Sequence, residues 1–181
     1  MKFLIASDIH GSEYYCKKLI EAYKSENAGR LLLLGDILYH GPRNDLPRDY
    51  APKKVIEMLN GMKECIFCVR GNCDTEVDQM VLDFPILADY AVIPAGDSLI
   101  YATHGHKFNT DSLPPLSRGD ILLHGHTHLL CCEKFGEDNV YLNPGSVALP
   151  KGGNPRSYML YENGTFTCVD LSGNVLFQYG Q

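Results

Sequence analysis

Residues 122–130 read LLHGHTHLL and place three of the chain's seven histidines directly after an apolar run. Such a run is typical of a buried strand, and the glycine inside the turn lets the backbone bend tightly. The same arrangement, an apolar run followed by Asp, Asn or His, recurs at four other places. The five turns carry Asp8 and His10; Asp36; Asn72, Cys73 and Asp74; His104 and His106; and His124, His126 and His128.

The order of the apolar runs predicts the fold class. Runs at 2–7, 31–35 and 65–69 alternate with amphipathic stretches, which is the pattern of strand-helix units. From residue 91 onward the chain is mostly β-prone, and we expect strands at 91–95, 98–102, 120–125, 140–143, 157–162, 165–171 and 175–180. We therefore expect an α/β protein with two packed sheets and helices outside them, forming a single domain over residues 1–181. The proline-rich segment 41–52 is expected to be a surface loop.

Two helices carry recognisable end signals. The first has its apolar positions spaced by three or four residues, with Ser12 as its N-cap and Gly29 as its stop. A capping box formed by Thr75 and Asp78 predicts a further short helix that continues through Leu82.

Composition limits the class of partner and the compartment. No apolar stretch is long enough to cross a membrane or to serve as the core of a signal peptide, so a cytoplasmic protein is expected. The odd number of cysteines, seven, argues against a disulfide framework. A formal charge of −6 argues against a protein that binds duplex nucleic acid through a basic surface. This argument is weaker if some of the acidic residues bind metal.

All seven histidines lie in or next to the five turns, and their clustering beside Asp8 and Asp36 indicates a metal site. The carboxyl ends of neighbouring strands bring such residues together. Mixed Asp, Asn and His ligands without thiolate favour Mn²⁺, Ni²⁺, Zn²⁺ or Fe over Mg²⁺ and Ca²⁺. Seven candidate ligands are too many for one ion, so we expect two ions that share a carboxylate.

The motifs D-x-H, G-D, G-N-C-D, T-H-G-H and G-H-T-H, in this order, resemble the calcineurin-like metallophosphoesterase superfamily, and most closely its small bacterial and archaeal phosphodiesterases of the YfcE type. The resemblance spans nearly the whole chain. It implies a four-layer α-β-β-α sandwich of two mixed sheets with a dinuclear centre, usually most active with Mn²⁺. It also implies hydrolysis of a small phosphodiester by a water or hydroxide held between the two ions.

The same resemblance implies a role for each candidate ligand. Asp8, His10 and His128 would hold one ion, and Asn72, His104 and His126 would hold the other, with Asp36 bridging them. By contrast, His124 lies on the strand side of Gly125, and we expect it to support the ligands or to pack rather than to bind metal.

The leaving group needs a proton donor, and here the chain departs from the superfamily. Many members have G-N-H-[DE], whereas this chain has Cys73, whose thiol is a weak donor. We therefore expect either leaving groups that need little protonation or another acid, His106 or His40. The catalytic candidates are Asp36, Asn72, Cys73 and His106, while Asp74 is expected to serve as a helix N-terminal carboxylate.

Several loop residues are candidates for binding substrate. Arg43 and Asn44 follow the Asp36 strand and either reach the substrate phosphate, together with His40, or lie in a solvated loop. Lys151 and Arg156 are weaker candidates of the same kind. Ser146 lacks the surroundings of a nucleophile, so we expect it to shape a turn near the metals.

Other functions remain open at this point. The same fold and site suit a phosphomonoesterase or a nuclease, and a eukaryotic retromer subunit of this fold acts as a scaffold without a complete catalytic set. A metal store or sensor would bind metal without hydrolysis. A homo-oligomer, dimer or tetramer, is also open, because the C-terminal strands either form a subunit interface or cover the second sheet.

Overall fold

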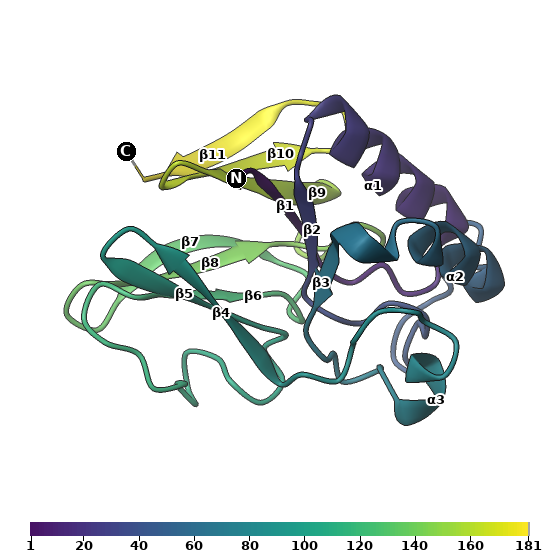
Figure 1. Cartoon of the computed structure of the whole chain (residues 1–181), viewed down its shortest axis with the longest axis horizontal. Coiled ribbons are helices and arrows are strands. Elements are labelled where there is room, and N and C mark those ends of the chain that lie inside the picture. The colour runs from purple at the N-terminus through teal and green to yellow at the C-terminus, as the bar shows by residue number, and fades with distance from the viewer. Residues whose placement is uncertain (181) are drawn as a thin grey trace.

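The computed structural model describes residues 1–180, and its strands form two mixed sheets that pack face to face (Figure 1). The first sheet has six strands in the order β11-β10-β9-β1-β2-β3, of which β1, β2 and β3 are parallel. Its strands are β1 (Phe3–Ala6), β2 (Arg30–Leu33), β3 (Ile66–Cys68), β9 (Ser157–Glu162), β10 (Thr165–Asp170) and β11 (Val175–Tyr179).

The second sheet has five strands in the order β4-β5-β6-β8-β7, of which β5, β6 and β8 are parallel. Its strands are β4 (Tyr90–Ala95), β5 (Ser98–Thr103), β6 (Ile121–His124), β7 (Leu130–Phe135) and β8 (Asn139–Pro144). Sequence reasoning found seven of the eight strands after residue 90 and missed β7. That strand lies at the sheet edge and exposes Cys132, Glu133 and Lys134, so it has no apolar alternation to detect.

Helices cover the outer face of the six-stranded sheet. The α-helices are α1 (Glu13–Ser25), α2 (Pro52–Asn60) and the single turn α3 (Glu76–Gln79), with a 3₁₀ turn at Lys63–Cys65. The buried side chains of α1 and α2 share one apolar cluster with β1 and β2, and a second cluster fills the space between the sheets. The α/β fold of two mixed sheets is confirmed. Within residues 1–180 every α-helix precedes β4, so loops replace helices outside the five-stranded sheet.

The C-terminal ends of α1 and α3 differ from the predicted ends, each for an identifiable reason. Ser12 caps α1 as predicted, but the helix ends at Ser25 because Asn27, with φ of 50°, adopts the left-handed conformation. The N–H groups of Asn27 and Ala28 then bond the carbonyls of Lys24 and Tyr23, which is a Schellman ending without glycine.

The predicted capping box of Thr75 and Asp78 is present in α3. The helix stops at Gln79 rather than at Leu82 because the Gln79 side chain donates to the carbonyls of Leu82 and Phe84. The same side chain accepts a hydrogen bond from the backbone of Ile86. The Gln79 side chain therefore provides hydrogen-bond partners for backbone groups of an irregular segment, which in a helix would bond to one another.

The C-terminal strands extend the six-stranded sheet within the chain itself. Side chains of Leu176, Phe177 and Tyr179 pack against the cluster between the sheets, so this part of β11 covers the core. No helix in the described part of the chain is long and apolar enough to span a membrane.

Candidate metal centre

The turns after the parallel strands have an unusual backbone. Eight non-glycine residues between 1 and 180 have positive φ, and five of them are predicted metal ligands: Asp8, His10, Asp36, His126 and His128. A left-handed residue other than glycine costs on the order of 1–3 kcal/mol and persists only where surrounding contacts impose it. Strain of this kind concentrates at functional sites, and here it turns the side chains of several strands toward one point.

Asp8, His10 and His128 form the first ligand group. The Nε2 atoms of His10 and His128 lie 3.2 Å apart, and each lies within 3.5 Å of the Asp8 Oδ1 atom. Each ring is oriented from its other side, because Nδ1 of His10 donates to the carbonyl of Tyr39 at 2.7 Å and Nδ1 of His128 donates to that of Leu149 at 2.5 Å. Hydrogen bonds of this kind fix the tautomer of metal-binding histidines.

This arrangement suits a cation. With both Nδ1 atoms donating, the neutral rings direct the Nε2 lone pairs of His10 and His128 at each other and at the Asp8 carboxylate. The buried Oδ1 atom of Asp8 accepts no hydrogen bond from any described group. Three facing lone-pair atoms repel one another unless a proton or a metal ion lies among them.

The pKa values follow from these contacts. Burial opposes ionisation of Asp8, but His10, His128 and His104 stabilise the carboxylate when they carry an additional proton, and this holds the pKa of Asp8 well below its usual value. Burial likewise opposes the charged form of His10, yet the Asp8 carboxylate outweighs it and raises the pKa of His10. The site therefore attracts positive charge at the position between these groups.

Asn72, His104 and His126 form the second group. The Nε2 atom of His104 lies 3.0 Å from Oδ1 of Asn72 and 3.2 Å from Nδ1 of His126. Nδ1 of His104 donates to the carbonyl of Leu34 at 2.6 Å, which leaves Nε2 free for a ligand. His126 presents Nδ1 instead, so the two rings offer different atoms to the same space.

Asp36 lies between the two groups, as expected of a bridging carboxylate. Its Oδ2 atom is 3.7 Å from Nε2 of His10 and 3.5 Å from Nε2 of His104. Its Oδ1 atom accepts the backbone N–H of Cys73 at 2.8 Å, which fixes the orientation of the carboxylate. All seven predicted ligands thus converge, and their oxygen and nitrogen donor set fits two divalent ions.

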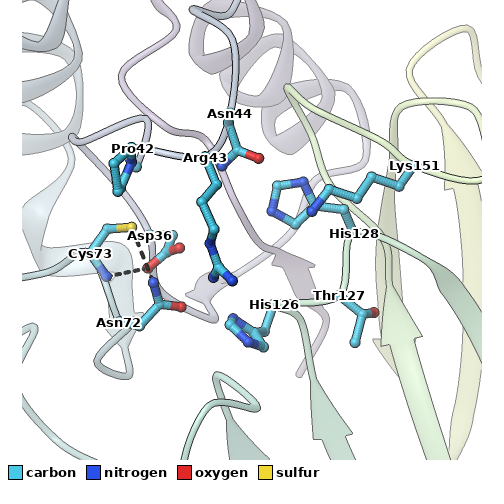
Figure 2. A pocket seen from close by; sticks show the side chains of 11 residues that line it. Asp36, Pro42, Arg43, Asn44, Asn72, Cys73, His126, Thr127, His128 and Lys151 are labelled. Atoms are coloured by element: carbon cyan, nitrogen blue, oxygen red, sulfur yellow. Dashed lines mark hydrogen bonds between the residues drawn. The ribbon is translucent and has the colours of Figure 1, made fainter.

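The metal-centre cavity has a volume of about 370 Å³. Figure 2 shows Arg43 reaching into it from the loop above, toward Asp36, Asn72 and His126. Asn44 and Lys151 also line the cavity, so three of the predicted substrate residues are brought to the site. A guanidinium in this position is suited to a phosphate group, whose oxygens it can bind in pairs.

Two other candidates lie elsewhere. The His40 ring packs between Tyr39 and Tyr50, with ring centroids 4.8 and 5.2 Å away, and the residues that line the cavity do not include it. Arg156 places its guanidinium over Tyr15 and donates to the carbonyl of Ala148. The geometry thus gives no support to a substrate-binding role for either residue.

The candidate acids are poor proton donors in this structure. Burial, together with the charge of His104, lowers the pKa of His106 to about 4, so its ring is neutral near pH 7. Burial and the Asp36 carboxylate raise the pKa of Cys73, so the thiol stays protonated, and a thiol is a weak hydrogen-bond donor. Nδ1 of His106 is buried and has no partner among the described residues.

His124, the last residue of β6, differs from the two histidines in the turn that follows. It stacks on Tyr141 with ring centroids 4.2 Å apart, and its Nδ1 contacts the carbonyl of Gly125. Burial lowers the pKa of His124 to about 4. The structure thus places His124 in a packing position, while His126 and His128 face the cavity.

The expectation for Asp74 was wrong. α3 begins at Glu76 with Thr75 as its N-cap, and Asp74 is buried. The Asp74 carboxylate accepts the backbone N–H groups of Asp36, Ile37 and Gly71 at 2.7–2.9 Å. It therefore joins two of the turns that carry metal ligands.

Sequence reasoning also missed Asn143. Its amide donates to the carbonyl of Gly125 and to the hydroxyls of Thr127 and Tyr141, which holds the turn that carries His126 and His128. The signal was available, because Asn143 is a polar residue that ends an apolar run. As expected, Ser146 shapes a turn: its hydroxyl donates to the carbonyl of Asp8 and accepts the N–H of Leu149.

Comparison with known proteins agrees with the geometry. A family model described as the calcineurin-like phosphoesterase superfamily domain matches residues 1–165. Phosphodiesterase YfcE of Escherichia coli strain K12 is 46% identical over 172 residues, which are 95% of this chain and 93% of that protein. The solved structure of Yfce, a phosphoesterase from E. coli, has a TM-score of 0.95 at 45% identity and covers 99% of each chain.

A more distant structure shares the fold alone. Vps29 from Chaetomium thermophilum has a TM-score of 0.64 at 17% identity, covering 100% of this chain and 99% of its own. The family model extends over all the strand ends that carry the seven converging ligands, and the E. coli relative matches 95% of the chain. The chain belongs to the calcineurin-like phosphoesterase superfamily.

Proposed function

We propose that this protein is a metal-dependent phosphodiesterase that hydrolyses a small phosphodiester. The observation that carries the proposal is the position of Asp36, whose carboxylate lies between two groups of ligands that face one cavity. The similarity to a protein named phosphodiesterase supports the diester as substrate. The nitrogen-rich ligand set favours Mn²⁺, with Ni²⁺, Zn²⁺ or Fe as other candidates.

Two divalent ions, when bound, would supply Lewis acidity that activates water and neutralises charge at phosphorus. The chain's own residues position the substrate. Arg43 binds the non-bridging phosphate oxygens through its guanidinium, and Asn72, which lines the same cavity, orients the same group. Asp36 keeps its orientation through the Cys73 N–H, which limits reorganisation during the reaction.

The substrate is a small molecule in this proposal. The net charge of −6 disfavours a long nucleic acid duplex, and the cavity of about 370 Å³ suits a single diester group. A monoester or a nucleic acid end would use the same polar groups, so comparison of substrates decides between them.

All seven cysteines are free, which supports a reducing compartment such as the cytoplasm.

Hydrolysis of bis(p-nitrophenyl) phosphate by protein loaded with Mn²⁺, Ni²⁺, Zn²⁺ or Mg²⁺ tests the proposal. We expect turnover with Mn²⁺, a loss of at least about 100-fold in Asp36→Asn, and slower hydrolysis of p-nitrophenyl phosphate. If loaded protein hydrolyses neither compound, the function is non-catalytic. Faster hydrolysis of the monoester would make the protein a phosphomonoesterase.

A further inference from the structure

An apolar groove lies next to the metal-centre cavity. It has a volume of about 380 Å³ and lies between the turn after β2, the start of α2, and α3 together with Val81, two residues beyond that helix. Its apolar wall is formed mainly by Leu38, Tyr39, Tyr50, Ile56, Val77 and Val81. Val77 is 69% exposed and Val81 is 43% exposed, although both are large apolar side chains. Exposed apolar side chains that gather around a hollow are typical of a binding site.

The groove and the cavity share a wall. Cys73 lines both of them, and in Figure 2 its side chain stands beside Asp36 and Asn72 at the edge of the cavity. Tyr39 provides a second link, because its carbonyl accepts the hydrogen bond from Nδ1 of His10 while the residue also lines the groove. The groove is therefore attached directly to the ligand framework.

The two hollows differ in chemistry. The cavity presents polar and apolar surface in about equal parts, and its Arg43, Asn44 and Lys151 side chains suit the charged phosphate, whereas the surface of the groove is mostly apolar. A phosphodiester carries two organic groups, each joined to phosphorus through an ester oxygen. An apolar group gains affinity only where it leaves water. The groove offers such a surface within reach of the shared Cys73 wall.

We propose that the groove binds one organic group of the diester and gives the enzyme a preference for diesters with an apolar, aromatic ester group. This inference rests on the proposed function and extends it to the substrate class. The Tyr39 and Tyr50 rings supply an aromatic surface for such a group, and Val77 and Val81 close the opposite side.

The test compares methyl p-nitrophenyl phosphate with phenyl p-nitrophenyl phosphate, which have the same leaving group. After correction for uncatalysed reactivity, we expect the wild-type protein to prefer the phenyl diester by about tenfold in kcat/KM. The double substitution of Val77→Ser and Val81→Ser should reduce this preference to about twofold without changing hydrolysis of the methyl diester. Met80→Ser is the matched control, because Met80 is 83% exposed between these residues and does not line the groove.

Each other outcome has a separate meaning. Equal kcat/KM for both diesters in the wild-type protein overturns the groove proposal and leaves the phosphodiesterase intact. An unchanged preference in the double variant, with a smaller sedimentation coefficient than wild type, would assign the groove to a second copy of the chain. If neither diester is hydrolysed, the proposed function fails, and calorimetric binding of diphenyl and dimethyl phosphate tests the groove alone. Equal dissociation constants for these two anions would also overturn the groove proposal.

Discussion

The buried Asp74 carboxylate accepts the backbone N–H of Asp36 at 2.8 Å and thereby holds the residue that lies between both ligand groups. The same Oδ2 atom accepts the N–H of Gly71 at 2.7 Å, while Oδ1 accepts that of Ile37 at 2.9 Å. One side chain thus connects the turn after β2 to the turn after β3. Its role is to position the ligands rather than to bind metal.

Asp74→Asn is expected to weaken metal binding. An amide keeps one acceptor oxygen but has an NH₂ group in place of the other oxygen. This NH₂ group faces a backbone N–H donor, so at least one hydrogen bond is lost in a buried site. We expect about a 10–100-fold loss in Mn²⁺ affinity and a loss of roughly 1–3 kcal/mol in the free energy of unfolding of the metal-free protein. Isothermal titration and urea denaturation measure these quantities.

Asp170→Asn provides the matched control for this substitution. The Asp170 carboxylate accepts the N–H groups of Ser172 and Asn174, but in an exposed turn between β10 and β11. We expect its Mn²⁺ affinity to equal that of the wild-type protein. Unchanged affinity in Asp74→Asn as well would show that the turn holds Asp36 without this carboxylate.

The sequence identified the ligands better than the groups that hold them. Asp8 and His126 could be found because a polar residue after an apolar run is an identifiable pattern, and parallel strand ends meet at one edge. The carbonyls of Tyr39 and Leu149, which orient His10 and His128, could not be found. Every residue has a carbonyl, so its identity carries no signal about which one lies near a distant ring.

Helix ends show the same limit. Ser12 and Thr75 were recognised because capping uses the side chain of the residue itself. The end of α1 depends on the left-handed backbone conformation of Asn27. Glycine adopts this conformation more often than asparagine, so the sequence favoured Gly29 as the residue that ends the helix. Sequence patterns therefore predict contacts that are local and specific to a side chain, and miss those set by tertiary packing.

Gly71→Ala tests how tightly the two turns pack. A Cβ atom at this position would lie 2.1 Å from Oδ1 of Asp36 and 2.3 Å from its backbone nitrogen. The carboxylate has to move, so we expect at least about a tenfold loss in metal affinity and about 1–3 kcal/mol of destabilisation. Gly29→Ala is the control, because a Cβ there meets only ordinary contacts at 3.6 Å. Equal affinity in both variants would contradict the close packing around Asp36.

Metal binding is expected to stabilise the fold in a way that depends on pH. Burial opposes the charge on His10, but the Asp8 carboxylate raises the pKa of His10 above 6.5. In the metal-free protein this pair contributes stability below pH 6.5 that is lost as pH rises through the raised pKa. A metal replaces the proton, so Mn²⁺ should raise the melting temperature more at pH 8 than at pH 6.

Calorimetry measures this effect. At 100 times the dissociation constant, Mn²⁺ adds about 2.7 kcal/mol to the free energy of unfolding, which corresponds to roughly 5–10 °C for a chain of this size. Titration in buffers of different ionisation enthalpy should also detect proton release. A shift in melting temperature that is the same at pH 6 and pH 8, without proton release, would argue against a proton held by His10.

The histidine that ends β6, His124, and the two in the turn after it, His126 and His128, are expected to differ in function. His126→Asn and His128→Asn remove candidate ligands, so we expect kcat/KM to fall at least about 100-fold. His124→Asn removes a ring that stacks on Tyr141, so the loss should be less than about tenfold in activity. It should instead lower the melting temperature of the metal-free protein. An equal loss of activity in all three variants would contradict the division.

Cys73→His is expected to change which leaving groups the enzyme accepts. Burial and the Asp36 carboxylate keep the Cys73 thiol protonated, and it donates weakly to a departing oxygen. The wild-type protein should therefore hydrolyse methyl aryl diesters far faster than dialkyl diesters, because p-nitrophenolate leaves without protonation.

An imidazole at position 73 supplies a better proton donor, and we expect it to narrow the gap between aryl and alkyl leaving groups by about 100-fold. A slope of log kcat/KM against leaving-group pKa measures the change, with a methyl group kept as the other substituent so that the apolar groove is not involved. Cys73→Ser is the control of similar size and should keep the wild-type slope. If Cys73→His also keeps that slope, the proton reaches the leaving group from a source other than residue 73.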